Sequence, residues 1–128
     1  MPKITLLFAS LHALLLLALI APISRHRHRH RIGLGSGGDP VLARKIRVHA
    51  NFIEFVPIAL LLLGLLELAG LQAAWLWTFG SALLLARVMH AIGLSRHGGY
   101  SFGRFWGTVL TMLVVLGMAG AGLWLSLR

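Results

Sequence analysis

Residues 47–66 read RVHANFIEFVPIALLLLGLL, and the change of character within this stretch decides how the chain folds. Residues 55–66 are almost wholly apolar, whereas the residues before them include a cation, an amide and an acid. Crossing the hydrocarbon of a bilayer takes about twenty helical residues. The apolar part is too short for this, so part of the polar half must enter the membrane and face protein or a water-filled cavity.

The rest of the chain has the composition of an integral membrane protein. Of its 128 residues, 58% are hydrophobic, 12% are charged and none is Cys. A soluble domain carries about 25% charged residues, so this chain has a surplus of apolar surface that must face lipid or other subunits. The lack of Cys excludes disulfides, thiolate catalysis by the protein and cysteine metal sites.

Four hydrophobic segments predict an all-α, integral membrane four-helix bundle that forms a single domain over residues 1–128. We expect its helices at about residues 4–23, 41–68, 73–94 and 104–127. Pro22 predicts the end of the first helix, and Asp39-Pro40 predicts the start of the second, with Asp39 as N-cap. Small residues in the last segment favour close helix packing, namely Gly107, Gly117, Gly120 and Gly122.

The positive charge of the chain is local and predicts its orientation. The net charge is +9, and seven of the twelve Lys and Arg residues lie between Arg25 and Arg47. Basic loops stay on the cytoplasmic side of a membrane. In a bacterial inner membrane we therefore expect loops 24–40 and 95–103 in the cytoplasm and both termini in the periplasm. Such loops favour contact with anionic membrane lipids, and we expect no nucleic-acid partner.

Two groups of polar residues have both a structural and a functional interpretation. Alternating histidines in residues 25–31, RHRHRHR, could chelate a metal, but the interleaved arginines repel cations. We therefore expect a solvated basic loop that faces lipid, and no metal site. His12 lies in the middle of the first hydrophobic segment. We interpret it as hydrogen-bonded inside the bundle, with a ligand or proton carrier as the alternative.

A polar stripe on the second helix is the main candidate for a binding site. Arg47, Asn51 and Glu54 are spaced i, i+4, i+7, which places them on one face of a helix. Ionisable groups at membrane depth are costly, so the stripe needs a reason to be there. It could tie helices together, with Glu54 paired to Arg87 or Arg47, or it could bind a zwitterionic, polar ligand.

The segment RVHANFIEFVP, residues 47–57, resembles the second-helix signature of the MAPEG family, the membrane-associated proteins in eicosanoid and glutathione metabolism. Residues 86–90, ARVMH, are similar to the third-helix segment of that family. The resemblance covers nearly the whole chain, and its pattern is nearest to the small bacterial inner-membrane branch. It implies a homotrimer of four-helix subunits, with glutathione bound between neighbouring subunits near the cytoplasmic side.

The resemblance also implies roles for individual residues. Those assigned to glutathione binding are Arg47, Asn51, Glu54, Arg87 and His90. An arginine near the start of the fourth helix stabilises the glutathione thiolate in the enzymes. Arg104 is the best match, and Arg96 is the second choice. A neighbouring guanidinium lowers the pKa of a thiol, which makes the sulfur a better nucleophile at neutral pH.

The implied function is that of a glutathione-dependent transferase or peroxidase acting on a lipophilic electrophile. Glutathione is then the co-substrate, and the other partners are further copies of the chain, membrane lipids and a lipophilic small molecule. Phe55 and Leu94 depart from the pattern, because tyrosines are common at both positions in the enzymes. The alternative is a non-catalytic membrane protein of the same fold that binds a lipid or an anionic metabolite. A transporter has little support, because the chain shows no inverted repeat.

Overall fold

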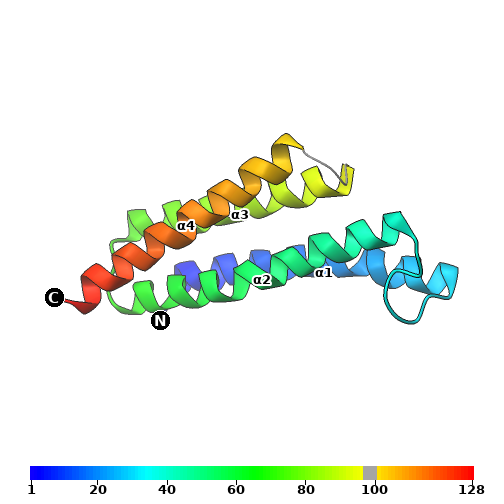
Figure 1. Ribbon diagram of the computed structural model, residues 1–128. Helices are drawn as coiled ribbons and strands as arrows, with labels where there is room; N and C mark the ends of the chain where they lie inside the picture. Colours follow the sequence, from blue (N-terminus) through cyan, green and yellow to red (C-terminus); the bar gives the residue numbers. More distant parts are fainter. Residues whose placement is uncertain (97–100) are drawn as a thin grey trace.

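The computed structural model describes residues 1–96 and 101–128, and nearly all of them lie in four long helices. These are α1 (Lys3–His30), α2 (Pro40–Leu68), α3 (Ala73–Arg96) and α4 (Phe102–Ser126). Each helix is long and apolar enough to cross a membrane, which confirms the all-α membrane architecture. Successive helices run in opposite directions, so both chain ends lie at the same end of the bundle (Figure 1).

Helix α1 is longer than predicted. It continues through Pro22 and ends at His30, so residues 24–30 form a further part of the helix and the prediction of a loop there is wrong. Proline removes a single backbone hydrogen bond, which a long helix can tolerate at the cost of a local bend. The last turn of α1 consists of basic residues, and cations interact favourably with the negative end of the helix dipole.

The start of α2 follows its prediction. The Asp39 carboxylate accepts hydrogen bonds from the backbone N–H groups of Val41, at 2.8 Å, and Leu42, at 3.2 Å. Pro40 occupies the first helical position, where an N–H group would have no partner within the helix, so proline costs no hydrogen bond there. The N-cap thus fixes where the chain leaves the glycine-containing segment 32–39 and turns back along α1.

The other end of α2 caps the first turn of α1. The Glu67 carboxylate accepts hydrogen bonds from the backbone N–H groups of Ile4, at 2.9 Å, and Thr5, at 2.7 Å. The first four N–H groups of a helix have no partner within the helix, and two of these are satisfied here by a side chain from α2. The two helices are therefore joined at both ends, by Glu67 at one and by the short connection at the other.

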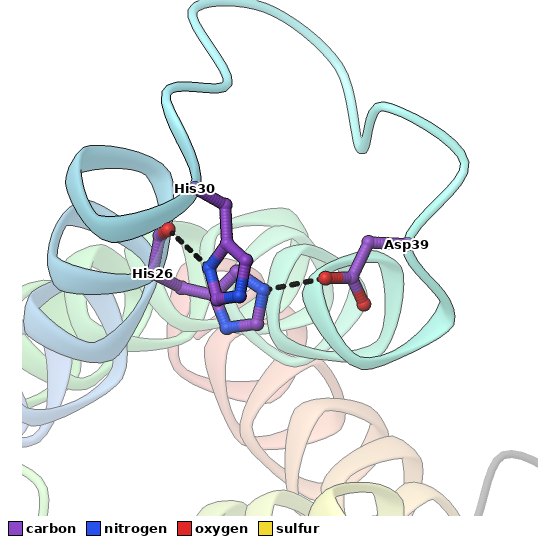
Figure 2. Close-up of side chains that lie close together, drawn as sticks. All are labelled: His26, His30 and Asp39. Carbon is purple, nitrogen blue, oxygen red and sulfur yellow. Dashed lines mark hydrogen bonds and ion pairs between the residues drawn. The ribbon is translucent and has the colours of Figure 1, made fainter.

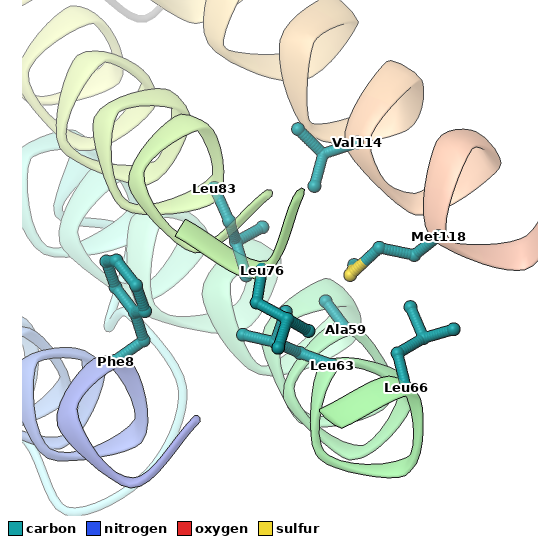
Figure 3. Close-up of a cluster of buried hydrophobic side chains, with 8 residues drawn as sticks. All are labelled: Phe8, Ala59, Leu63, Leu66, Leu76, Leu83, Val114 and Met118. Carbon is teal, nitrogen blue, oxygen red and sulfur yellow. The ribbon is translucent and has the colours of Figure 1, made fainter. Parts of the chain in front are cut away.

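A buried hydrophobic cluster packs all four helices together in the half of the bundle that holds the chain ends (Figure 3). We call it the apolar cluster. It consists of Phe8, Ala59, Leu63, Leu66, Leu76, Leu83, Val114 and Met118. Many other large apolar side chains point outward, among them Leu14, Leu61 and Leu116. Lipid solvates such side chains, so helix association rests on close packing more than on removal of apolar surface from water.

Helices α3 and α4 make the most extensive contact in the bundle, and glycines allow it. A Cβ atom on Gly107 would lie 2.7 Å from the carbonyl oxygen of Ala86 and from the backbone nitrogen of His90. A Cβ on Gly103, one turn earlier, would lie 2.7 Å from another α3 carbonyl oxygen. The pair is thus a small-xxx-small contact of the kind that brings membrane helices together. Gly120 has open space beside it within the described residues, so it does not serve the predicted packing role.

Candidate functional site

Arg87 of α3 is the largest fully buried side chain in the described part of the protein. Only 1% of its surface is exposed. Its Nη2 donates a hydrogen bond to Oδ1 of Asn51 on α2 at 2.7 Å. The guanidinium carbon lies 5.9 Å from the centre of the Phe52 ring, within the range of a cation–π contact. A permanently charged group is thus held between two membrane helices by one amide and one aromatic face.

The atoms around Arg87 leave hydrogen bonds unmade. Within residues 1–96 and 101–128, no partner is present for Nε and Nη1 of Arg87, Nδ1 of His90 or Nε2 of His12. His12 and His90 are 1% and 2% exposed. A buried polar group without a partner costs about 1–3 kcal/mol. We call His12, Asn51, Arg87 and His90 the polar cluster, and its open donors and acceptors suit a polar ligand or ordered water.

His12 brings α1 into the polar cluster. Its Nδ1 donates to the carbonyl oxygen of Phe8 at 2.7 Å, which confirms its interpretation as a hydrogen-bonded residue inside the bundle. Its ring centre lies 6.1 Å from that of Phe52, so the open Nε2 belongs to the same region as Arg87. Sequence reasoning did not include His12 among the site residues. In the sequence, His12 is marked only as a single titratable side chain within an apolar segment. The fold is needed to show which residues it approaches.

The polar stripe on α2 divides between the interior and the surface. Nη1 of Arg47 lies 3.6 Å from Oε1 of Glu54, and these side chains are 59% and 50% exposed on the single chain. Of the two pairings considered for Glu54, the one with Arg47 is formed. Asn51 faces inward to Arg87. An exposed ion pair contributes about 0–1 kcal/mol, so stability alone does not account for the stripe.

Arg104 lies in the first turn of α4, close to the same site. Its backbone N–H donates to the hydroxyl oxygen of Ser101, the N-cap of α4, at 3.3 Å, and its side chain is exposed. The backbone of Arg104 packs against Gly93 of α3, about one turn from His90, so the start of α4 lies close to the polar cluster. Of the predicted site residues, the structure joins Arg87 to Asn51 and Arg47 to Glu54, and it places the backbone of Arg104 against α3. Arg96 is exposed at the end of α3, and residues 97–100 of the predicted loop 95–103 lie outside the described residues.

The two positions where tyrosine is common in the enzymes have different surroundings. Leu94 is buried and packs with Val48 and Ala91 in a small apolar group between α2 and α3. Phe55 is partly exposed on α2. Neither side chain has a hydroxyl, so the recognition of a polar ligand at this site depends on the charged and amide groups described above.

A second group of polar side chains joins the end of α1 to the start of α2 (Figure 2). Nε2 of His26 lies 2.6 Å from Oδ2 of Asp39, and Nζ of Lys45 lies 3.2 Å from Nδ1 of His26. The hydrogen bond from His26, with those from the backbone of Leu42 and Val41, lowers the pKa of Asp39. These contacts hold the N-cap of α2 against α1.

The same group contains a possible set of metal ligands, since candidate atoms of His26, His30 and Asp39 lie within 4.8 Å of one another. However, the two imidazole rings are stacked, with centres 4.3 Å apart and planes inclined by 20° (Figure 2). A metal binds an imidazole nitrogen in the plane of the ring, and two nearly parallel stacked rings do not point at one ion. Nδ1 of His30 is also engaged by the His26 carbonyl oxygen, at 3.0 Å. The expectation of no metal site stays a prediction.

Comparison with known proteins places this architecture in a family. Residues 5–124 match the model of the MAPEG family. The chain is 34% identical over 121 residues to the inner membrane protein YecN of Escherichia coli strain K12, and the same values hold for YecN of Escherichia coli O6:H1. Each match spans 94% of this chain and 91% of the relative. The chain therefore belongs to the MAPEG family and is an integral inner membrane protein.

Proposed function

We propose that this MAPEG protein binds glutathione and either transfers it to a lipophilic electrophile or uses it to reduce one. Buried Arg87 is the observation that carries the proposal, because Asn51 holds it while Nε and Nη1 lack partners among the described residues. A carboxylate matches two parallel N–H donors of a guanidinium better than any neutral group does. Glutathione supplies two carboxylates and one ammonium group.

The α2 stripe complements the charges of that ligand. Arg47 offers a cation and Glu54 an anion, and their own contact is long, at 3.6 Å, with both side chains half exposed on the single chain. Such a contact is weak, so each partner is free to exchange it for an oppositely charged group of the tripeptide. Asn51 orients Arg87, and the open Nδ1 of His90 provides one more polar contact near the same charge.

Arg104 is the residue that we assign to the sulfur. Its guanidinium stabilises the thiolate and so favours ionisation of the thiol, whose proton passes to water. Its place in the first turn of α4 adds the positive end of a helix dipole to the same field. In the transfer reaction the sulfur electron pair forms the new C–S bond, and the leaving group departs with its own electron pair. An apolar acceptor reaches this position directly from the bilayer.

A homotrimer would complete the site, which is half open on the single chain. Arg47, Glu54 and Arg104 are all exposed there, although a low-dielectric, water-free site makes their charges more effective. We therefore place a neighbouring subunit over this face. Native mass spectrometry of the detergent-purified protein tests this assembly. A strictly monomeric protein that still binds glutathione would contradict the shared site.

The charges and the fold together support one orientation in the membrane. Both termini lie at one end of the bundle, and the Arg-His run, residues 25–31, lies at the other end (Figure 1). We assign the basic end, with the last turns of α1 and the connections from α1 to α2 and from α3 to α4, to the cytoplasm and both termini to the periplasm. A reporter that is active only in the cytoplasm, fused after Arg128, should give no signal. Activity of that reporter would reverse the orientation.

The deciding experiment is a glutathione-binding titration by calorimetry on detergent-purified protein. We expect binding at millimolar concentration or tighter, and at least tenfold weaker binding by Arg87→Gln. The control Arg31→Gln removes the same charge from an exposed position at the end of α1 and should bind like wild type. No binding by wild type would remove the glutathione hypothesis and leave the family and fold in place. Binding without turnover of a chromogenic electrophile would favour the non-catalytic alternative, which Phe55 and Leu94 already support.

A further inference from the structure

Two hollows adjoin on the surface of α1 and α2 near the Arg-His run, and they share Pro22 and Lys45. The larger has a volume of about 210 Å³. It is lined by Ala18, Leu19, Pro22, Val41, Arg44, Lys45 and Val48. The smaller has a volume of about 190 Å³. It is lined by Pro22, Arg25, His26, Arg29 and Lys45. One hollow is thus mainly apolar, and its neighbour is mainly cationic.

The position of these hollows along α1 matches the layers of a bilayer. The apolar part of α1 ends at about residue 23. A helix rises about 1.5 Å per residue, so residues 4–23 span the roughly 30 Å of the hydrocarbon core. The apolar hollow beside Ala18 and Leu19 therefore lies at the depth of acyl chains. The cationic hollow, about two to three turns further along α1, lies at the depth of phosphate headgroups.

The cations of the smaller hollow have no acidic partner. The nearest acid along the chain, Asp39, accepts hydrogen bonds from His26 and from the backbone of α2. Among the described residues, Arg25, Arg29 and Lys45 form no ion pair with any carboxylate. Nζ of Lys45 lies 3.2 Å from Nδ1 of His26, which is not a carboxylate. Three cations at headgroup depth thus leave a local excess of positive charge that favours a bound phosphate.

We propose that these two hollows form a binding site for one anionic phospholipid. The phosphodiester lies among Arg25, Arg29 and Lys45, and one acyl chain follows the apolar hollow past Ala18 and Leu19. A zwitterionic lipid fits less well, because its ammonium group adds a further cation to three. A soluble phosphate leaves the apolar hollow empty. The site is separate from the polar cluster, and it does not depend on glutathione binding.

Native mass spectrometry with defined lipids tests the headgroup half of the site. Wild type should retain phosphatidylglycerol at least tenfold more strongly than phosphatidylcholine with the same acyl chains. Arg25→Gln/Arg29→Gln should reduce that preference to about twofold or less. The control Arg27→Gln/Arg31→Gln removes the same charge from the same run but outside both hollows, and it should keep the preference. Equal loss in both variants would show diffuse surface attraction and overturn the proposal.

A second variant tests the acyl half without changing any charge. Ala18 is exposed, so Ala18→Phe fills the apolar hollow from outside with no demand on the bundle core. It should weaken phosphatidylglycerol binding at least fivefold at unchanged thermal stability. Inorganic phosphate at millimolar concentration should not displace the lipid. Displacement by phosphate, or lipid binding unaffected by Ala18→Phe, would show a soluble anion site and contradict the assignment. Glutathione binding should be the same in all these variants.

Discussion

The apolar cluster and the polar cluster occupy neighbouring parts of one bundle, but they differ in whether their side chains leave hydrogen-bonding groups without partners. The eight residues of the apolar cluster fill space between all four helices and leave no polar atom to satisfy (Figure 3). The polar cluster buries a guanidinium and two imidazoles and leaves four nitrogen atoms without partners among the described residues. The apolar cluster explains why the helices stay together. The polar cluster is costly to stability, which points to a role in binding.

The same contrast separates the two kinds of interhelix contact. Glu67 and Asp39 each satisfy backbone N–H groups that would otherwise lack partners, so their hydrogen bonds complete the structure. Arg87 uses one nitrogen for Asn51 and keeps two open. Mutations should therefore separate stability from ligand binding, and four experiments, ordered by expected effect, test that separation.

The largest effect is expected in the apolar cluster. Leu63 is fully buried, and Leu63→Ala should lower the free energy of unfolding by about 2–5 kcal/mol, because it leaves a cavity where all four helices meet. The fraction that stays folded should bind glutathione with wild-type affinity. Reversible unfolding in mixed micelles measures the first quantity and calorimetry the second. A stable variant with impaired binding would reverse the roles assigned to the two clusters.

Arg104→Ala should lower turnover by about a hundredfold, because a preorganised charge is lost where the thiolate forms. The pKa of the bound thiol should rise, with little change in affinity for the neutral thiol. Thiolate absorbance against pH, compared between wild type and variant, measures this shift. Arg96→Ala, which removes a charge from the nearby end of α3, is the control. If the thiol pKa is the same in wild type and Arg104→Ala, Arg104 has no part in the mechanism and Arg96 becomes the candidate.

Asn51→Ala should weaken glutathione binding about tenfold while turnover at saturation stays near wild type. The hydrogen bond from Arg87 is charge-assisted, and such bonds contribute about 1.5–3 kcal/mol. Thr111→Val is the matched control, because the Thr111 hydroxyl is buried but donates within its own helix to the carbonyl oxygen of Gly107. Isothermal titration of both variants decides the matter. Similar losses in both would mean that the site tolerates no buried change, and Asn51 would lose its specific role.

The smallest effect is expected from pH at the N-cap of α2. The Asp39 pKa is lowered by His26 and by the α2 backbone, relative to about 3.9 in an unfolded chain. A carboxyl group of this kind stabilises the fold above the unfolded value, and the contribution disappears as pH falls through the lower folded value. Exchange of the Val41 and Leu42 amide hydrogens, corrected for intrinsic rates, should thus be constant from pH 5 to 7 and faster in strong acid. Asp39→Ala should remove this acid dependence, and an unchanged profile would argue against the cap.

Hydrophobic length and spacing were enough to predict four helices and the face shared by Arg47, Asn51 and Glu54. The end of α1 was predicted wrongly, because Pro22 breaks one hydrogen bond while the basic residues beyond it stabilise the helix end. Cross-helix contacts were harder to predict. They depend on the rotation of each helix about its axis, which packing of pairs such as Gly107 against α3 determines.

The same limit applies to the candidate site. Spacing along α2 predicts that Asn51 and Glu54 share a face, but the identity of their partners depends on α3. Arg87 forms a hydrogen bond with Asn51, and Glu54 forms an ion pair with Arg47. His12 was not among the predicted site residues for the same reason. The sequence of one helix does not indicate that its Nε2 lies near residues of α2 and α3 without a hydrogen-bond partner among the described residues.

The hydrogen bonds from Ile4 and Thr5 to Glu67 have a consequence for biosynthesis. The first turn of α1 is made before α2, and its cap is more than sixty residues further along the chain. Until Glu67 has left the ribosome, these two N–H groups depend on water or on the insertion machinery. They can enter the hydrocarbon fully paired only once α2 is complete. The capping of α1 by Glu67 is therefore complete only when α1 and α2 lie side by side as a hairpin.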